Sequence, residues 1–321
     1  MIALGDDMKN KSTLILGAVF LVFVIIFMIT SFKPREVTKG AVPLFEGEKP
    51  LIDKIEITNP KKRKKVVLEK KNSIWYITQP FEYKASNVTV EQTITGLLGI
   101  DVDDPAISTR EETFDKFDVG DSTGISLKVY GAGILALDAV VGKHTVDLTH
   151  TYARMAGSSD VALWRGLFAR QIDREADDWR DKIIFSFNTD DILSVKVAEG
   201  KNVREITLSD STWVYTENGK GKEIDQSKAK KFVGLIAALS CDTFADESDI
   251  PRAAEKQPDT RVSFTVRNGD THSFDVWSPG EKDNNRYLVR EVDGKVLFRF
   301  YKYRGEQLVM KYDGIKPDEK T

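Results

Sequence analysis

Two of the three histidines in the chain flank a carboxylate at a spacing that can bind a metal. His144, Asp147 and His150 lie three residues apart, and on a helix this spacing would place them on one face, where they could bind zinc. The flanking Val140-Val141-Gly142 and Thr145-Val146 are instead typical of a strand and a turn, in which such residues alternate between faces. We therefore predict a polar turn and no metal site.

The sequence gives little evidence for the active site of a hydrolase. His272 falls in a predicted hairpin turn after Gly269-Asp270, which does not favour a Ser-His-acid triad. The carboxylates of Glu111-Glu112 and of Asp177-Asp178 are neighbours along the chain, so they do not indicate the converging pair of a glycosidase. We predict no catalytic residue.

Two short motifs partly fit the patterns of cation or cofactor sites. Asp101-Val102-Asp103-Asp104 is acidic, but it lacks the central glycine and the closing glutamate of an EF-hand loop. It follows a predicted helix end and precedes Pro105, so we expect a solvated turn. Gly131-Ala132-Gly133 lacks the third glycine and the following helix of a dinucleotide-binding loop. The sequence predicts neither a metal ion nor a cofactor.

The densest positive charge is the run Lys61-Lys62-Arg63-Lys64-Lys65. It could contact anionic lipid headgroups or an acidic partner; alternatively, because it follows Asn59-Pro60 and precedes a strand, it is a solvated hairpin loop. No aromatic residue interrupts the lysines, and the net charge of the chain is -3. Both features disfavour nucleic-acid binding.

Two tryptophans and the single cysteine complete the candidate residues. Trp75 and Trp213 could stack on a sugar, but their equivalent positions in two similar stretches favour packing in a core. Cys241 has no partner cysteine, so there is no internal disulfide, and we expect a buried thiol rather than a reactive one.

The elements that hold these residues occur twice. A strand pattern, a tryptophan eighteen residues after its second apolar residue, and an amphipathic helix recur at an offset of 138 residues. A repeat of this length indicates a duplicated domain rather than a solenoid of short units. The matching pairs include Ile55 with Leu193, Ile57 with Val195, Trp75 with Trp213, Ile94 with Phe232, and Leu97 with Leu235. Further on the offset drifts slightly, and Leu127 matches Phe264.

An apolar segment precedes the duplicated region. Residues 12–32 contain no charged residue, and a helix of this length would span about 30 Å, the thickness of the hydrocarbon core of a bilayer. We predict an uncleaved transmembrane anchor in contact with the lipid bilayer. Basic residues lie on both sides of it, so their count does not set its orientation. Long domains cross largely regardless of charge, and we expect the C-terminal part outside the cytoplasm.

The predicted fold class is α+β, with a transmembrane helix followed by two tandem similar domains of mainly antiparallel sheet and packed helices. Helices are expected from 87 to 99, 167 to 181 and 225 to 239. The predicted organisation is a tail at 1–11, the anchor at 12–32, an extended linker at 33–52, domains at 53–189 and 190–316, and a tail at 317–321. The polar chain after Asp313 is expected to fray.

Residues 50–315 contain a series of short motifs. They are Ile55, Ile57, Trp75, Pro80, Ala85, Val88, Leu97-Leu98, Val140-Val141-Gly142-Lys143, Tyr152-Ala153-Arg154 and Trp179-Arg180-Asp181-Lys182. Together these motifs resemble the bacterial domain-of-unknown-function family DUF4340. One segment departs from the family pattern: Phe117-Asp118-Val119-Gly120 stands where a Phe-Gly-Leu turn is expected.

The resemblance implies a protein anchored in the bacterial inner membrane with its domains on the periplasmic or outer side. Relatives are often encoded beside ABC transporter components of the gliding-motility type, which suggests a transporter subunit as the protein partner. No catalytic residues follow from the family. The leading hypothesis is a non-enzymatic accessory or protein-interaction module. The alternatives are a cell-wall or polysaccharide-binding module and an envelope hydrolase with an unrecognised site.

Overall fold

The computed structural model describes residues 40–47, 49–280 and 286–318. The predicted anchor at 12–32, the tail at 1–11 and residues 33–39 of the predicted linker lie outside this part of the chain. Within it, no helix combines the length and the apolar character needed to cross a membrane.

The first sheet has ten strands in the order β1-β6-β10-β9-β8-β7-β2-β3-β4-β5, and every neighbouring pair is antiparallel. The alternation of apolar and polar residues in the sequence fits these strands, because successive side chains of a strand point to opposite faces of the sheet. The strands are β1 (Ala41–Pro43), β2 (Ile52–Asn59), β3 (Lys64–Lys71), β4 (Ile74–Gln79), β5 (Tyr83–Lys84), β6 (Asp101–Ser108), β7 (Ile125–Gly131), β8 (Ile134–His144), β9 (His150–Met155) and β10 (Val161–Arg165).

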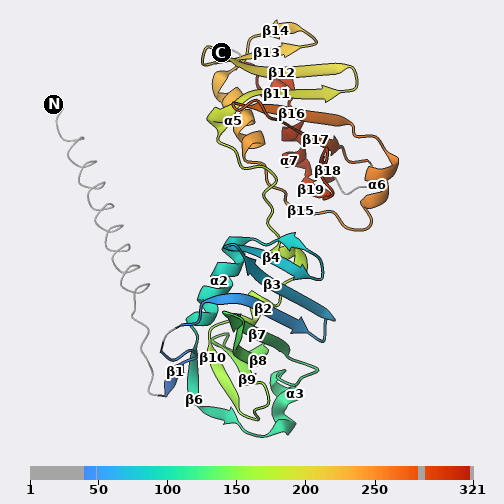
Figure 1. The fold of residues 1–321 in the computed structure, drawn as a ribbon. Coiled ribbons are helices and arrows are strands. Elements are labelled where there is room, and N and C mark those ends of the chain that lie inside the picture. Colours follow the sequence, from blue (N-terminus) through green and yellow to red (C-terminus); the bar gives the residue numbers. More distant parts are fainter. Residues whose placement is uncertain (1–39, 48, 281–285, 319–321) are drawn as a thin grey trace, which may run out of the picture.

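The second sheet has nine strands in the order β14-β13-β12-β11-β16-β17-β18-β19-β15, again with antiparallel neighbours. The prediction of two mainly antiparallel sheets with a few helices is therefore confirmed (Figure 1). The strands are β11 (Ile192–Glu199), β12 (Asn202–Ser209), β13 (Thr212–Glu217), β14 (Lys220–Lys222), β15 (Thr243–Phe244), β16 (Thr260–Val266), β17 (Thr271–Trp277), β18 (Arg286–Glu291) and β19 (Phe298–Tyr301).

The two sheets share one strand order once β1 is set aside. Reading from β6 to β5 in the first sheet and from β15 to β14 in the second gives the same succession of hairpins and crossovers. Register agrees as well: Ile57 pairs with Leu127 across β2 and β7, and Val195 pairs with Phe264 across β11 and β16. These are the positions that the repeat in the sequence equates.

One long helix covers each sheet, α2 (Asn87–Leu98) on the first and α5 (Gln226–Ala237) on the second (Figure 1). Each begins at a residue whose side chain accepts from a backbone N–H of the first turn, as N-cap residues do: Ser86 in α2, and Asp225 at 2.8 Å in α5. The first residue of each helix also accepts from the backbone N–H of the core tryptophan, Asn87 from Trp75 at 3.2 Å and Gln226 from Trp213 at 2.8 Å.

The remaining helices are short. They comprise α3 (Phe114–Phe117), α4 (Phe168–Ile172), α6 (Ile250–Glu255) and α7 (Lys302–Leu308), with 3-10 turns η1 (Glu111–Thr113), η2 (Ala176–Trp179), η3 (Thr189–Asp191) and η4 (Tyr312–Gly314). The chain order places α4 after β10 and α7 after β19, so these two helices are counterparts.

Each sheet buries an apolar core beneath its helices. Trp75 is fully buried and Trp213 is 8% exposed, which confirms their prediction as core residues. Cys241 is also buried, as predicted.

Contacts between the two halves gather where the chain leaves the first sheet, and we call this region the joint: Phe81, Tyr83, Arg180 and Phe244 with the backbone of 180–187. The guanidinium carbon of Arg180 lies 3.4 Å from the ring centroid of Phe244 and 4.1 Å from that of Tyr83. A backbone bridge joins Ala85 to Arg180 within the first half, and a second joins Ile183 to Ser240 of the second half. The joint therefore connects both halves by backbone and side chains.

Several local predictions were wrong. Residues 167–181 form α4 and η2 instead of one helix, because the chain turns at Asp173, whose carboxylate binds Asn59 and Lys62. Residues 101–104 start strand β6, which also makes the predicted linker residues 41–43 an edge strand. The chain beyond Asp313, expected to fray, continues through the buried Ile315.

Candidate functional site

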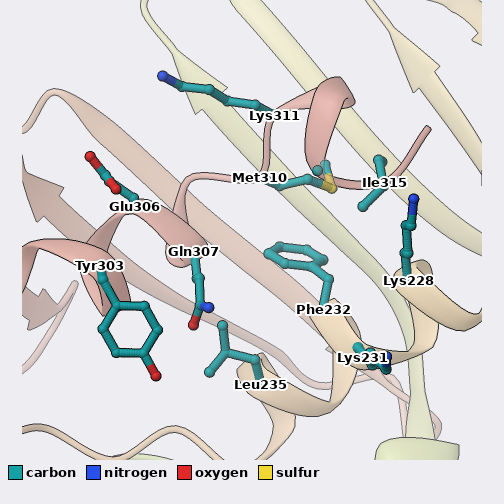
Figure 2. Close-up of a pocket in the computed structure, with 11 residues that line it drawn as sticks. Lys228, Lys231, Phe232, Leu235, Tyr303, Glu306, Gln307, Met310, Lys311 and Ile315 are labelled. Atoms are coloured by element: carbon teal, nitrogen blue, oxygen red, sulfur yellow. The ribbon is translucent and has the colours of Figure 1, made fainter. Parts of the chain in front are cut away.

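A groove lies between α5 and the chain from α7 to Ile315, on the helical side of the second sheet (Figure 2). Its volume is about 850 Å³. The amphipathic pattern of α5 explains one wall, because residues three and four apart share a helix face. The lining residues are Lys228, Lys231, Phe232 and Leu235 from α5, and Tyr303, Glu306, Gln307, Met310, Lys311, Gly314 and Ile315 from the opposite side.

The floor of the groove is apolar. Figure 2 shows Phe232 of α5 facing Met310 and Ile315 across the groove. These three side chains are buried, Leu235 is half-buried, and Tyr303 at the mouth is 65% exposed. Apolar surface left open at the mouth favours binding of another apolar group.

The rim carries more positive than negative charge. Lys228, Lys231 and Lys311 line it, against one carboxylate, Glu306. Lys228 is held by Asp318 at 2.5 Å, and this ion pair lowers the pKa of Asp318. Lys231 and Lys311 form no ion pair among the described residues. The groove therefore combines an apolar floor with two unneutralised cations.

The counterpart helices of the first half pack differently. At Gly96 of α2 an added Cβ would overlap the side chain of Gln171 in α4, so α4 rests directly on α2 there. Gly234, the equivalent glycine of α5, has only Thr189 nearby. The second half thus diverges from the first in how its two helices pack.

This arrangement suits an amphipathic segment of another protein, which would place apolar side chains in the groove and acidic ones at the lysines. The lining set contains no serine, cysteine or histidine that could act as a nucleophile or base.

The histidines considered for zinc lie at the turn between two strands, as predicted. His144 ends β8, Asp147 lies in the turn, and His150 begins β9. Asp147 accepts from the hydroxyl of Thr145 at 2.6 Å, and among the described residues no group of three or more potential ligands could hold a metal ion.

The fold brings together one pair that the sequence did not suggest. His150 Nε2 lies 3.1 Å from Asp103, and its Nδ1 lies 2.6 Å from the hydroxyl of Thr149. This order resembles an acid–base relay, but Arg165 also binds Asp103 at 2.7 Å. Since Thr149 and His150 are adjacent residues, we interpret the pair as part of the junction of β6, β9 and β10.

One further motif of the sequence fits a catalytic pattern that was not predicted above. Gly120-Asp121-Ser122-Thr123-Gly124 fits the G-x-S-x-G pattern of a nucleophile elbow, which requires a strand before the turn and a helix after it. Here α3 precedes the turn and β7 follows it, the reverse order. The pentapeptide therefore serves as a tight turn.

The remaining candidates belong to the structural framework. His272, predicted in a turn, lies in β17 and stacks on Phe264 with ring centroids 5.3 Å apart. Burial raises the pKa of the Cys241 thiol to about 11, which opposes a role as nucleophile.

The groove was missed because its walls are far apart in sequence. The sequence predicted an apolar helix face with Phe232 and Leu235, but no pattern in it predicted the short helix at 302–308 on the opposite side of the groove. An exposed Tyr303 among charged residues was the one available signal.

The comparisons with known proteins give one match. No curated protein matches the chain, and no solved structure matches it. The model of the family described as "Domain of unknown function (DUF4340)" matches residues 75–260, more than half of the chain. That range runs from the core tryptophan of the first half, through the joint, to the start of β16 in the second. The chain therefore belongs to the DUF4340 family.

Proposed function

We propose that this protein is a non-enzymatic accessory module, anchored in the bacterial inner membrane by residues 12–32, with two tandem similar domains at 53–189 and 190–316 outside the cytoplasm. In this proposal the groove between α5 and α7 binds a protein partner in the membrane or envelope. The predicted partner is a subunit of an ABC-type transporter, a suggestion that rests on the family resemblance.

The groove carries this proposal. Its apolar floor and the lysines at its rim favour a segment that is apolar on one face and acidic on the other. A volume of about 850 Å³ accommodates several side chains rather than one small ion.

The alternatives have less support. The polysaccharide-binding module relied on Trp75 and Trp213 as exposed stacking platforms, and both are buried. The hydrolase would have to use the His150–Asp103 pair, in which Arg165 already neutralises the carboxylate. No observation favours either over partner binding.

Site-specific photo-cross-linking in native membranes tests the proposal. A benzophenone amino acid would replace Tyr303, which is 65% exposed at the mouth of the groove, and, in a matched control, Ile134, which is 73% exposed on β8 of the first sheet. We expect a cross-linked protein of defined mass from position 303 and none from position 134. Mass spectrometry would identify it.

A second variant tests the chemistry of the groove. Leu235→Asp would add a negative charge on the apolar wall, whereas Val214→Asp adds the same charge on an exposed face of β13. We expect Leu235→Asp to abolish the cross-link and Val214→Asp to retain it. Partner recovery in mild detergent that is the same for both variants would contradict binding at the groove.

A further inference from the structure

We propose that a second pocket, on the first half of the molecule, binds a phosphate group. The pocket lies at one end of the first sheet, between the β2–β3 turn, the end of β8 and α4, with a volume of about 370 Å³. It is separate from the groove, so this proposal does not depend on the proposed function.

The pocket holds more cations than its carboxylates neutralise. Lys61 binds Asp118 at 2.7 Å, and Lys62 binds Asp173 at 2.5 Å. All four residues line the pocket, together with Lys143 and Arg170. The side chains of Lys143 and Arg170 form no hydrogen bond or ion pair within the described part of the chain. Two positive charges are therefore left for a ligand.

The framework around these cations is fixed. Asn59 is buried, accepts from the backbone N–H of Lys62 at 3.2 Å and donates to Asp173 at 2.9 Å, which holds the β2–β3 turn against α4. On the opposite wall, a Cβ on the buried Gly142 would overlap the carbonyl of Phe117. This close approach sets Lys143 beside the turn that carries Asp118.

His144 adds a polar group to the same wall. The hydroxyl of Thr151 donates to the carbonyl of Gly166 at 2.7 Å, so it must accept from His144 Nδ1, which lies 3.2 Å away. The neutral ring therefore carries its proton on Nδ1, and its Nε2 carries a lone pair that can accept a hydrogen bond. Burial, and then the charge of Arg170, lower the pKa of His144, as expected beside an excess of positive charge.

A phosphate group fits this charge and geometry. The planar guanidinium of Arg170 can donate two parallel hydrogen bonds to phosphate oxygens, and the ammonium of Lys143 supplies a point charge. The pocket also accounts for part of the basic run singled out in the sequence: Lys61 and Lys62 line it, whereas Lys64 turns away and pairs with Glu175.

The phosphate could belong to a lipid headgroup or to a soluble compound, and titration of the full-length protein in a neutral detergent distinguishes them. The probes are inorganic phosphate, dihexanoyl phosphatidylglycerol, and sodium chloride at matched ionic strength, with thermal stability as the readout. We expect phosphate to raise the Tm above that in chloride. If the phosphatidylglycerol binds at least tenfold tighter than inorganic phosphate, the source is a lipid headgroup; binding of inorganic phosphate alone indicates a soluble one.

Variants locate the effect. Arg170→Gln and Lys143→Gln should each weaken binding of the effective probe about tenfold, the consequence of losing one charge-assisted contact. Lys201→Gln, an exposed lysine in the corresponding β11–β12 turn of the second sheet, is the matched control and should leave binding unchanged. Equal stability in phosphate and chloride, with no response to the lipid, would overturn the proposal. So would an equal loss of binding in Lys201→Gln.

Discussion

Replacing Arg180 by alanine should loosen the joint between the two halves of the molecule. The guanidinium of Arg180 lies between aromatic rings: its central carbon is 3.4 Å from the centroid of Phe244, 4.1 Å from that of Tyr83 and 5.1 Å from that of Phe81. Only Phe244 belongs to the second half. The side chain of Arg180 is 13% exposed, so its contact with Phe244 is largely desolvated.

The size of the effect follows from these contacts. A cation over an aromatic ring contributes about 0.5–1 kcal/mol at exposed sites and about 2 kcal/mol when desolvated. Arg180 also positions Tyr83, whose ring meets Phe244 edge-on at 5.6 Å, a geometry that adds about 0.5–1.5 kcal/mol. Against this, the buried Nε of Arg180 has no hydrogen-bond partner among the described residues, and its removal relieves a cost. We expect a net loss of about 2 kcal/mol.

Hydrogen exchange of amides that cross the joint measures this loss. The N–H of Ile184 donates to Leu239 at 2.8 Å, and the N–H of Cys241 donates to Lys182 at 2.9 Å. A loss of about 2 kcal/mol in the free energy of local opening should accelerate exchange of these amides about 30-fold.

Arg174→Ala is the matched control for this experiment. Arg174 lies close in sequence and also covers an aromatic ring, Trp179 at 5.5 Å, but it does not contact the second half through any ring. Its removal should leave the Ile184 and Cys241 amides at their original rates. Unchanged exchange in Arg180→Ala, or equal acceleration in Arg174→Ala, would refute the role of Arg180 in the joint.

Two further predictions follow from ionisable groups. Cys241 is buried with a thiol pKa of about 11, so about 0.1% is thiolate at pH 8; a thiol reagent should label the native protein at least about 100-fold more slowly than the denatured protein, and equal rates would contradict its burial. Burial alone would raise the pKa of Asp173, but Lys62 and Asn59 outweigh it, so the net shift is downward. A lowered carboxyl pKa adds stability above the unfolded value, near 3.8, which is lost as pH falls through the folded value. Denaturant unfolding should therefore find Asp173→Asn less stable than wild type at pH 7, with the difference shrinking below about pH 4; a difference that does not depend on pH would contradict this.

The strands and long helices could be predicted because their signals are local and occur twice. Ile57 and Leu127 alternate within their own strands, and their equivalents Val195 and Phe264 repeat the pattern. When two segments of one chain have the same apolar spacing, a strand pairing inferred for one half supports the same pairing in the other half. The buried tryptophans followed from the same equivalence.

The failures share a physical cause, since each depends on a partner distant in sequence. The apolar spacing of 167–181 fits a helix, but Asp173 accepts from Asn59, 114 residues earlier, and the chain turns there. The acidic run that contains Asp103 suggested a solvated turn. In the structure, Arg165 neutralises the carboxylate of Asp103, and β10 pairs with the strand that contains it. The groove and the phosphate pocket could not be predicted from local sequence patterns for the same reason, because their walls come from elements that are far apart in the chain.

The two halves keep their cores alike and differ on their surfaces. Strand order, register and the hydrogen bond from the backbone N–H of the core tryptophan to a helix side chain are shared, because these features determine whether each sheet buries its apolar face. Free of that constraint, α4 rests on Gly96 in the first half, whereas the second half has a groove between α5 and α7. Because the joint connects the halves through Arg180 and the backbone bridge between Ile183 and Ser240, we expect it to hold the groove and the phosphate pocket in one arrangement. A partner that engages both would gain affinity from that fixed spacing, and loss of Arg180 would weaken its binding without a change in either site.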